Sequence, residues 1–461
     1  MAKINTKYLL AISLVSALGG LLFGYDWVVI GGAKPFYEKF FDITNSPNLQ
    51  GWAMSSALLG CLFGAIASGI FSDRYGRKKL LIFAAFLFSL SAVGTGASNN
   101  YAPFILYRIM GGIGIGLASN LSPMYIAEIS PASMRGKFVS LNQLTIVIGI
   151  LLAQLANWQI AEPVPPAATD AEILASWNGQ MAWRWMFWAE TVPAGLFFIL
   201  MFFVPESPRW LAKNGKEDKV ENILARIGGK EYAHREYQNI RKTLANETGK
   251  VNFRVLLQPG LRKVLLIGIV IAAFQQWSGI NVIFNYAEEV FEAAGYGVSD
   301  ILFNIVVTGS VNLIFTFIAI YTVDKLGRRA LMLVGAGGLA GIYAFMGAAY
   351  YFQVSGWPLL LLVVIAIACY AMSLAPVTWV VLSEIFPNRV RGAAMAVATV
   401  SLWLASFLLT YTFPLLNAAF GASGTFWLYG LICLAGLLFI YKKLPETKGK
   451  SLEEIEQEIA T

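Results

Sequence analysis

Apolar stretches long enough to cross a bilayer follow one another along almost the whole chain. They lie at 8–31, 50–71, 80–98, 102–125, 138–159, 184–204, 263–285, 301–323, 331–352, 357–382, 394–416 and 422–441. A membrane-crossing helix needs about twenty mostly apolar residues, whereas a water-facing domain carries about 25% charged residues. Of the 461 residues, 13% are charged and 57% are hydrophobic. The sequence therefore predicts an all-α membrane protein with twelve transmembrane helices, and it excludes a disordered regulator, a secreted disulfide scaffold and a nucleic-acid-binding protein.

Lysine and arginine residues are concentrated in alternate loops, and this distribution predicts the orientation of the helices. The loop 73–79 (DRYGRKK), the loop 324–329 (DKLGRR) and the long polar segment 205–262 are rich in them, whereas 160–183 contains none. Because positively charged loops remain on the inner side, both termini are expected in the cytoplasm. The formal charge of +7 then reflects topology, although two lysines fall in the predicted outer loop 33–49.

Short charged motifs occur twice in the same order, once in each half of the chain. The repeated segments are 73–78 with 324–329, 127–136 with 383–392, and 205–207 with 445–447. Such repeats predict a transporter fold of two six-helix bundles, with the substrate site between them near the middle of the membrane. We expect an N-terminal bundle (1–204), a cytoplasmic helical linker domain (205–262), a C-terminal bundle (263–441) and a cytoplasmic tail (442–461).

Acidic and basic side chains around these motifs are candidates for a cytoplasmic gate. In such a gate, ion pairs lock the inner ends of the bundles together in one state and separate in the other. The candidates are Asp73, Arg77, Glu128, Arg135, Glu206, Arg209, Asp324, Arg328, Glu384, Arg391 and Glu446. The alternative is that these are solvated loop charges that only fix the topology.

Three ionisable residues fall inside predicted spans, where a buried charge is costly and usually functional. Asp26 comes late in the first span, and Arg108 and Glu190 come early in the fourth and sixth, so all three are expected at a similar depth in the outer half. Arginine keeps its proton, whereas a carboxylate can be protonated when its partner or its access to solvent changes. We predict a proton-coupling site in which Asp26 is protonated from outside, Arg108 turns to Glu190, and the proton leaves inward. A static ion pair that only holds the helices together is the alternative.

Amide and indole side chains inside the spans predict a site for a neutral, hydroxylated substrate. Amides donate and accept hydrogen bonds, which matches the hydroxyl groups of a sugar. The predicted substrate-binding residues are Gln143, Gln275, Gln276, Asn281, Tyr286, Asn312, Trp379 and Trp403. Gln276 and Asn281 are five residues apart and share one side of the helix only if it is irregular, and Gly279 permits such a break. Pro376 is expected to kink the tenth span. The alternative is that these amides only link helices and the tryptophans only pack.

Several motifs resemble those of the sugar porter family of the major facilitator superfamily. They are GRKK (76–79), YRIMGGIGIGLASNLSPMYIAEISPASMRGK (107–137), PESPRW (205–210), QQWSGIN (275–281), DKLGRR (324–329), SEIFP (383–387) and PETKGKSLEE (445–454). The resemblance covers nearly the whole chain and is strongest to the bacterial proton-coupled xylose symporters. It implies a major facilitator fold with a short helical domain in the linker, in the plasma membrane (the bacterial inner membrane).

The resemblance also assigns roles to residues. In the xylose symporters the proton site is an aspartate after Phe-Gly-Tyr in the first helix, and the sequence FGYD at 23–26 places it on Asp26. Facilitative members carry an asparagine there, so Asp26 implies symport. The family arginine and the helix-six glutamate fall on Arg108 and Glu190. The sugar contacts of the family fall on the eight substrate-binding residues named above.

Three positions depart from the family pattern. Leu402 stands in place of a polar amide and Ala375 in place of a glycine, and both changes shrink or depolarise the pocket. Asn285 stands where an aromatic residue is common and is expected to open the outer side. These changes leave the identity of the sugar open.

The expected function is import of a neutral monosaccharide, a xylose-like pentose or a hexose, by proton symport through alternating access. The alternatives are a facilitative uniporter and a non-transporting sugar sensor. An enzyme is not expected, because the sequence shows no nucleophile–base pair, metal-ligand spacing or phosphate-binding loop, and the glycines at 111–116 lie inside a span. No cofactor or metal is expected. The expected partners are the monosaccharide, protons and the lipid bilayer, without nucleic acid, and the protein is expected to be a monomer.

Overall fold

The computed structural model describes residues 4–165, 168–246, 253–387 and 390–448. Within these residues, eleven helices are long and apolar enough to cross a membrane. The last of them, α19 (Arg391–Lys443), contains the final two predicted spans, which meet at Gly421, where the backbone is not helical (φ 66°, ψ 177°). The described helices thus provide the twelve predicted crossings.

The N-terminal half has five continuous crossings and one broken crossing. The continuous helices are α1 (Thr6–Phe40), α2 (Pro47–Tyr75), α3 (Arg77–Ala97), α4 (Tyr101–Ile129) and α5 (Arg135–Ile160). The sixth crossing consists of the π-helical turn η1 (Asn178–Ala182), α7 (Trp183–Ala189) and α8 (Thr191–Phe203), and the short helix α6 (Asp170–Ala175) precedes it. These helices are apolar on all sides, as expected where one side faces lipid and the other faces neighbouring helices.

Helices α2 and α4 approach each other closely through the glycine-rich segment 111–116. A side chain at Gly112 would collide with the backbone carbonyl of Ala57, and one at Gly60 would collide with that of Ile109. Small residues permit such close contacts between membrane helices. The glycines therefore serve helix packing.

The C-terminal half has the same number of crossings, and two of them are broken near their middle. The seventh crossing consists of α12 (Pro259–Trp277) and α13 (Ile280–Asn285), and the short helix α14 (Ala287–Glu292) follows it. The tenth crossing consists of α17 (Trp357–Met372) and α18 (Leu374–Ile385). The continuous helices are α15 (Val298–Leu326) and α16 (Arg328–Tyr351), followed by α19. The tenth crossing breaks at Ser373 (φ −125°, ψ −89°), three residues before Pro376.

Between the two halves the chain forms a group of short helices. They are α9 (Pro208–Lys213), α10 (Glu217–Gly228), α11 (Lys230–Asn246) and the 3-10 helix η2 (Phe253–Leu257). Helices α9–α11 share a small hydrophobic core of their own that includes Trp210 and Leu224. The backbone N–H of Asn5 donates a hydrogen bond to the carbonyl of Ile227 (2.7 Å), which ties the start of α1 to this group.

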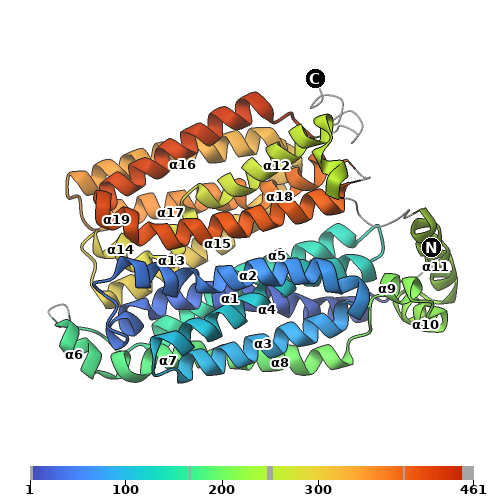
Figure 1. The fold of residues 1–461 in the computed structure, drawn as a ribbon, viewed down its shortest axis with the longest axis horizontal. Coiled ribbons are helices and arrows are strands. Elements are labelled where there is room, and N and C mark those ends of the chain that lie inside the picture. The colour runs from blue at the N-terminus through green and yellow to red at the C-terminus, as the bar shows by residue number, and fades with distance from the viewer. Residues whose placement is uncertain (1–3, 166–167, 247–252, 388–389, 449–461) are drawn as a thin grey trace.

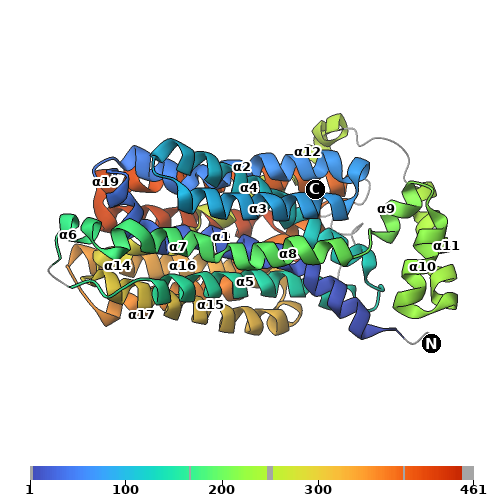
Figure 2. The same ribbon diagram turned by 90° about the horizontal axis from the view of Figure 1, so that it is seen from below.

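The two halves lie side by side, with most of their helices running along the same direction (Figure 1). Helices α9–α11 project from one end of the bundle, which we term the linker end (Figures 1 and 2). Helices α6 and α14 lie at the opposite end, which we term the distal end (Figure 1). The halves contact each other through α1 with α13 and α14, α2 with α19, and α5 with α15.

Candidate functional site

A break in the seventh crossing brings the predicted amide residues together. Gly279 adopts a left-handed conformation (φ 84°) between α12 and α13, and a side chain there would also crowd the ring of Tyr429. Only glycine adopts this conformation readily. The break allows Asn281 on α13 to donate a hydrogen bond to the side-chain carbonyl of Gln276 on α12, although five residues separate them. The predicted irregularity of this helix is confirmed.

Side-chain amides form a continuous chain of hydrogen bonds. Gln276 Nε2 donates to Gln275 Oε1 at 2.7 Å, and Gln275 Nε2 donates to the Tyr370 hydroxyl of α17 at 2.9 Å. All members of this chain, including Asn281, are buried. The Tyr370 hydroxyl accepts a hydrogen bond and keeps its own proton, so it can still donate to a ligand. The role of Tyr370 was not predicted, because the sequence of an apolar span does not indicate which side chain a tyrosine in it contacts.

The aromatic residues of the predicted site lie on several helices. Trp403 of α19 packs against Phe23 of α1, with ring centroids 5.7 Å apart, and its indole N–H has no hydrogen-bond partner within the described part of the chain. Tyr286 is buried and donates a hydrogen bond from its hydroxyl to the carbonyl of Thr410 (2.6 Å). The side chain of Trp379 on α18 is 37% exposed, whereas the amide side chains of the site are buried.

The remaining polar candidates lie on α5, α13 and α15. Asn312 of α15 is buried, and Gln143 of α5 is half-buried. Asn285, which was expected to open the outer side, is itself buried beside α1, where a side chain at Gly31 would come within 3.2 Å of its carbonyl oxygen. The end of α13 thus packs directly on α1 in this structure.

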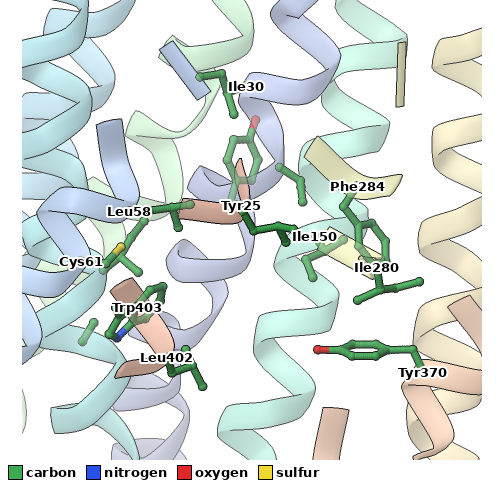
Figure 3. Packing of buried hydrophobic residues seen from close by; sticks show 14 of the residues in the cluster. Tyr25, Ile30, Leu58, Cys61, Ile150, Ile280, Phe284, Tyr370, Leu402 and Trp403 are labelled. Carbon is green, nitrogen blue, oxygen red and sulfur yellow. The ribbon is translucent and has the colours of Figure 1, made fainter. Parts of the chain in front are cut away.

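Apolar side chains from both halves meet close to these residues. Figure 3 shows Ile150 of α5, Ile280 of α13 and Leu402 of α19 in this region, together with the rings of Tyr370 and Trp403. The amide chain itself contains no charged group. The arrangement suits a neutral ligand that has both hydroxyl groups and apolar faces.

The structure pairs two of the three predicted intramembrane charges. Arg108 Nη1 on α4 donates to the carboxylate of Asp26 on α1, and Arg108 Nη2 donates to the Asp26 backbone carbonyl at 3.3 Å. The exposed fractions are 1% for Asp26 and 2% for Arg108. The guanidinium also lies over the ring of Phe187, 5.6 Å from its centroid. Water is therefore excluded around this ion pair.

The third charge, Glu190, lies at the junction of α7 and α8. It is buried and close enough to Asp26 and Arg108 to interact with both electrostatically. One oxygen of each carboxylate, Oδ2 of Asp26 and Oε1 of Glu190, has no hydrogen-bond partner among the described residues. Two buried carboxylates thus share one guanidinium, an arrangement that can hold a proton on one of them.

At the linker end of the N-terminal half, the predicted gate residues pair with one another. Arg77 forms ion pairs with Glu128 (2.8 Å) and Asp73 (3.4 Å). The Glu206 carboxylate accepts hydrogen bonds from the backbone N–H groups of Arg77 (3.0 Å) and Lys78 (3.1 Å) at the start of α3. A carboxylate is favourable at a helix N-terminus, where backbone N–H groups are free.

The C-terminal half has the same arrangement. Arg328 forms an ion pair with Glu384 (3.2 Å), and Glu446 accepts hydrogen bonds from the backbone N–H groups of Arg328 (2.9 Å) and Arg329 (3.1 Å) at the start of α16. Partial burial acts to raise the pKa of Glu446, but these backbone N–H groups and those of Thr447 and Lys448 outweigh it and lower the pKa below its ordinary value.

The other predicted gate residues are placed as follows. The Nε groups of Arg135 and Arg391 donate to the backbone carbonyls of Ala127 (3.1 Å) and Phe386 (3.2 Å), respectively. Arg209 lies on α9, and the side chain of Asp324 falls outside the described part of the chain. The ion pairs named here each join residues of the same half.

A second charged cluster at the distal end was not predicted. Lys34 of α1 forms ion pairs with Glu38 of the same helix and with Glu288 and Glu289 of α14. The first predicted span ends at residue 31, whereas α1 continues to Phe40 and carries Lys34 into the bundle. The spacing of Lys34 and Glu38, one helical turn apart, is the signal that could have indicated a longer helix.

Comparison with known proteins identifies relatives along the whole chain. Residues 12–459 match the model of the family described as sugar (and other) transporter. The chain is 42% identical to the D-xylose-proton symporter of Escherichia coli K12, over 98% of this chain and 96% of that protein. It is 39% identical to the arabinose-proton symporter of Bacillus subtilis, over 98% of this chain and 95% of that protein.

Solved structures of the xylose transporter XylE from E. coli have the same fold. The inward open conformation of that protein gives a TM-score of 0.85 at 40% identity, covering 98% of this chain and 99% of that chain. The proton:xylose symporter XylE bound to 6-bromo-6-deoxy-D-glucose gives a TM-score of 0.77 at 40% identity, with the same coverage.

Proposed function

The chain belongs to the sugar porter family of the major facilitator superfamily, and on this basis we propose that it imports a neutral monosaccharide together with a proton by alternating access. Membership of this family makes it a multi-pass membrane transporter of the sugar class and not an enzyme. The finer points, which are the coupling ion, the sugar and the direction, are the content of the proposal.

The observation that carries the proposal is the buried Asp26–Arg108 pair with Glu190 beside it. A carboxylate in this position can take up a proton only when the pair is reached by water or when Arg108 turns to another acid. Glu190 is such an acid. In the proposed cycle Asp26 is protonated from the outer side, Arg108 turns toward Glu190, and deprotonation on the inner side restores the pair.

The amide chain supports a sugar as the substrate. Gln275, Gln276, Asn281 and Tyr370 supply donors and acceptors in a buried site, while Trp403 supplies an aromatic face. The relatives named above are symporters of xylose and arabinose, and a glucose transport protein of Synechocystis is 39% identical over 98% of this chain and 97% of that protein. We propose a xylose-like pentose or a hexose.

We further propose that the linker end is cytoplasmic and that the structure is the inward-facing state. At the distal end, bonds join the two halves: the Tyr411 hydroxyl donates to Asn48 Oδ1 (2.6 Å), and the Val164 N–H donates to Ser299 Oγ (2.9 Å). At the linker end the described ion pairs stay within each half. The higher TM-score to an inward open relative supports the same assignment.

The linker-end networks are proposed to act as the cytoplasmic gate. Glu128 is held by Arg77 and by the Ser207 hydroxyl (2.5 Å), and Glu384 is held by Arg328 and by the Thr447 hydroxyl (2.5 Å). These bonds fix the shape of the inner loops in each half. Closure of the inner side would bring the two sets of charges face to face, where they can exchange partners.

The proposal is tested with purified protein in proteoliposomes. Uptake of labelled D-xylose, L-arabinose and D-glucose is measured with and without an inwardly directed proton gradient, in which the outside is more acidic than the inside. The external pH is recorded during uptake. The proposal predicts accumulation of at least one sugar above its external concentration, with alkalinisation of the medium. Equal uptake with and without the gradient would show facilitative transport, and absence of uptake for every sugar of a broad panel would favour a sensor.

A further inference from the structure

Lys34 lies at the distal end among three carboxylates that come from both halves. Its Nζ is 3.0 Å from Glu38 Oε2, 3.0 Å from Glu288 Oε2 and 2.8 Å from Glu289 Oε1. Only 3% of the Lys34 side chain is exposed. Since a buried ammonium group needs close partners in place of water, these carboxylates are what keeps Lys34 charged at this position.

In the same region α1 closely approaches the seventh crossing. A side chain at Gly31 of α1 would come within 2.9 Å of the carbonyl oxygen of Phe284. Lys34 lies about one helical turn further along α1. The backbone contact of Gly31 with α13 and the ion pairs of Lys34 with α14 therefore both fix the distal part of α1 against the C-terminal half.

We propose that Lys34, Glu288 and Glu289 form an ionic latch that holds the distal side of the transporter closed and that breaks each time the distal side opens. The inference rests on the proposed alternating access, since a latch is useful only if α1 and α14 separate during the cycle. Glu38 lies on the same helix as Lys34 and remains its partner when the latch opens.

The charges of the cluster determine how it responds to substitution. Among the described residues, Lys34 is the only cation within ion-pair distance of Glu288 and Glu289. Removing the lysine leaves three carboxylates facing one another in a buried space, which adds repulsion between the halves. Removing both glutamates of α14 leaves Lys34 paired with Glu38 inside one half, which removes the attraction without adding repulsion. Both changes weaken the latch, the first by adding repulsion between the halves and the second by removing attraction.

A cavity of ≈310 Å³ adjoins the latch and provides a matched control. It is also lined by Glu292, which lies on α14, one turn beyond Glu288, and forms no described ion pair with Lys34. A Glu292→Gln substitution removes one negative charge from α14, as each of the two latch glutamate substitutions does, at a neighbouring position that the latch does not use.

The test measures the distance between the two halves at the distal end without sugar. Spin labels are attached at Asn100→Cys, in the exposed connection before α4, and at Val354→Cys, in the exposed connection after α16, in a background where the partly exposed Cys369 is replaced by Ala. Pulsed electron resonance then gives the distance distribution. Lys34→Gln and the double variant Glu288→Gln/Glu289→Gln are expected to raise the ratio of long to short distances roughly tenfold. Glu292→Gln is expected to leave it unchanged.

A charge-reversal variant distinguishes loss of the latch from general damage to the fold. In Lys34→Glu combined with Glu288→Lys and Glu289→Lys, the ion pairs between α1 and α14 can form again with opposite sign, and the short distance is expected to return. An unchanged distribution in both Lys34→Gln and the double variant, or an equal shift in Glu292→Gln, would overturn the latch. The distances are recorded without sugar or gradient, so a failure of proton-coupled transport would not affect this result.

Discussion

Arg108 on α4 binds Asp26 on α1 through both its carboxylate and its backbone carbonyl. The backbone bond does not depend on the protonation state of the side chain. Neutralising Asp26 therefore weakens the bond of Arg108 to the Asp26 carboxylate but not its bond to the backbone carbonyl. Glu190, the neighbouring acid, is then the remaining charged partner of Arg108. This relationship explains how one proton at Asp26 can change the contacts of a residue on a different helix.

Loss of the central amide should weaken sugar binding. Gln276 accepts from Asn281 and donates to Gln275, so Gln276→Ala removes the middle of the hydrogen-bond chain and leaves the Asn281 N–H donor and the Gln275 carbonyl without these partners. Because an unsatisfied buried polar group costs about 1–3 kcal/mol, we expect sugar affinity to fall by roughly ten- to a hundredfold. Isothermal titration with the transported sugar measures the change, and an affinity within twofold of the unaltered protein would contradict the assignment.

Gly279→Ala should damage the same site through the backbone. A Cβ at φ 84° is strained by about 1–2 kcal/mol, and the added methyl would also crowd Tyr429. The variant is expected to unfold at a lower temperature and to bind sugar more weakly, since the break positions Asn281 next to Gln276. Alanine at Gly341, where a Cβ would meet open space, is the matched control and should change neither property.

The carboxylate of Glu446 should stabilise the linker end in a pH-dependent manner. Its lowered pKa means that the ionised form is favoured in the folded protein. The contribution to stability is therefore full above the ordinary pKa of a glutamate and is lost as the pH falls through the lowered value. Thermal unfolding of Glu446→Gln should show a lower midpoint than the unaltered protein at neutral pH, and the difference should disappear in strong acid. A constant difference at all pH values would argue against an ionised cap.

The features that the sequence predicted well are those with local causes. The crossings follow from the length of the apolar stretches, and the break at Gly279 follows from a residue that alone tolerates a positive φ. The hydrogen bond between Asn281 and Gln276 then follows from that break.

The features that the sequence did not predict depend on tertiary packing. Lys34 was assigned to an outer loop, because the hydropathy of the span falls before the helix ends, and its carboxylates on α14 lie in the other half of the chain. The partner of Gln275, Tyr370, lies on a helix whose residues are almost all apolar. The candidate gate residues were identified by type, but the sequence did not show that Arg77 binds Glu128 of its own half.

The most direct test of the central claim, that Asp26 carries the coupled proton, is sugar accumulation by the Asp26→Asn variant in proteoliposomes. Under an inwardly directed proton gradient this variant should not raise internal sugar above its external concentration, while exchange of labelled for unlabelled sugar continues. Asp42→Asn, the same substitution in the exposed connection after α1, should accumulate sugar like the unaltered protein. Full accumulation by Asp26→Asn would contradict the account.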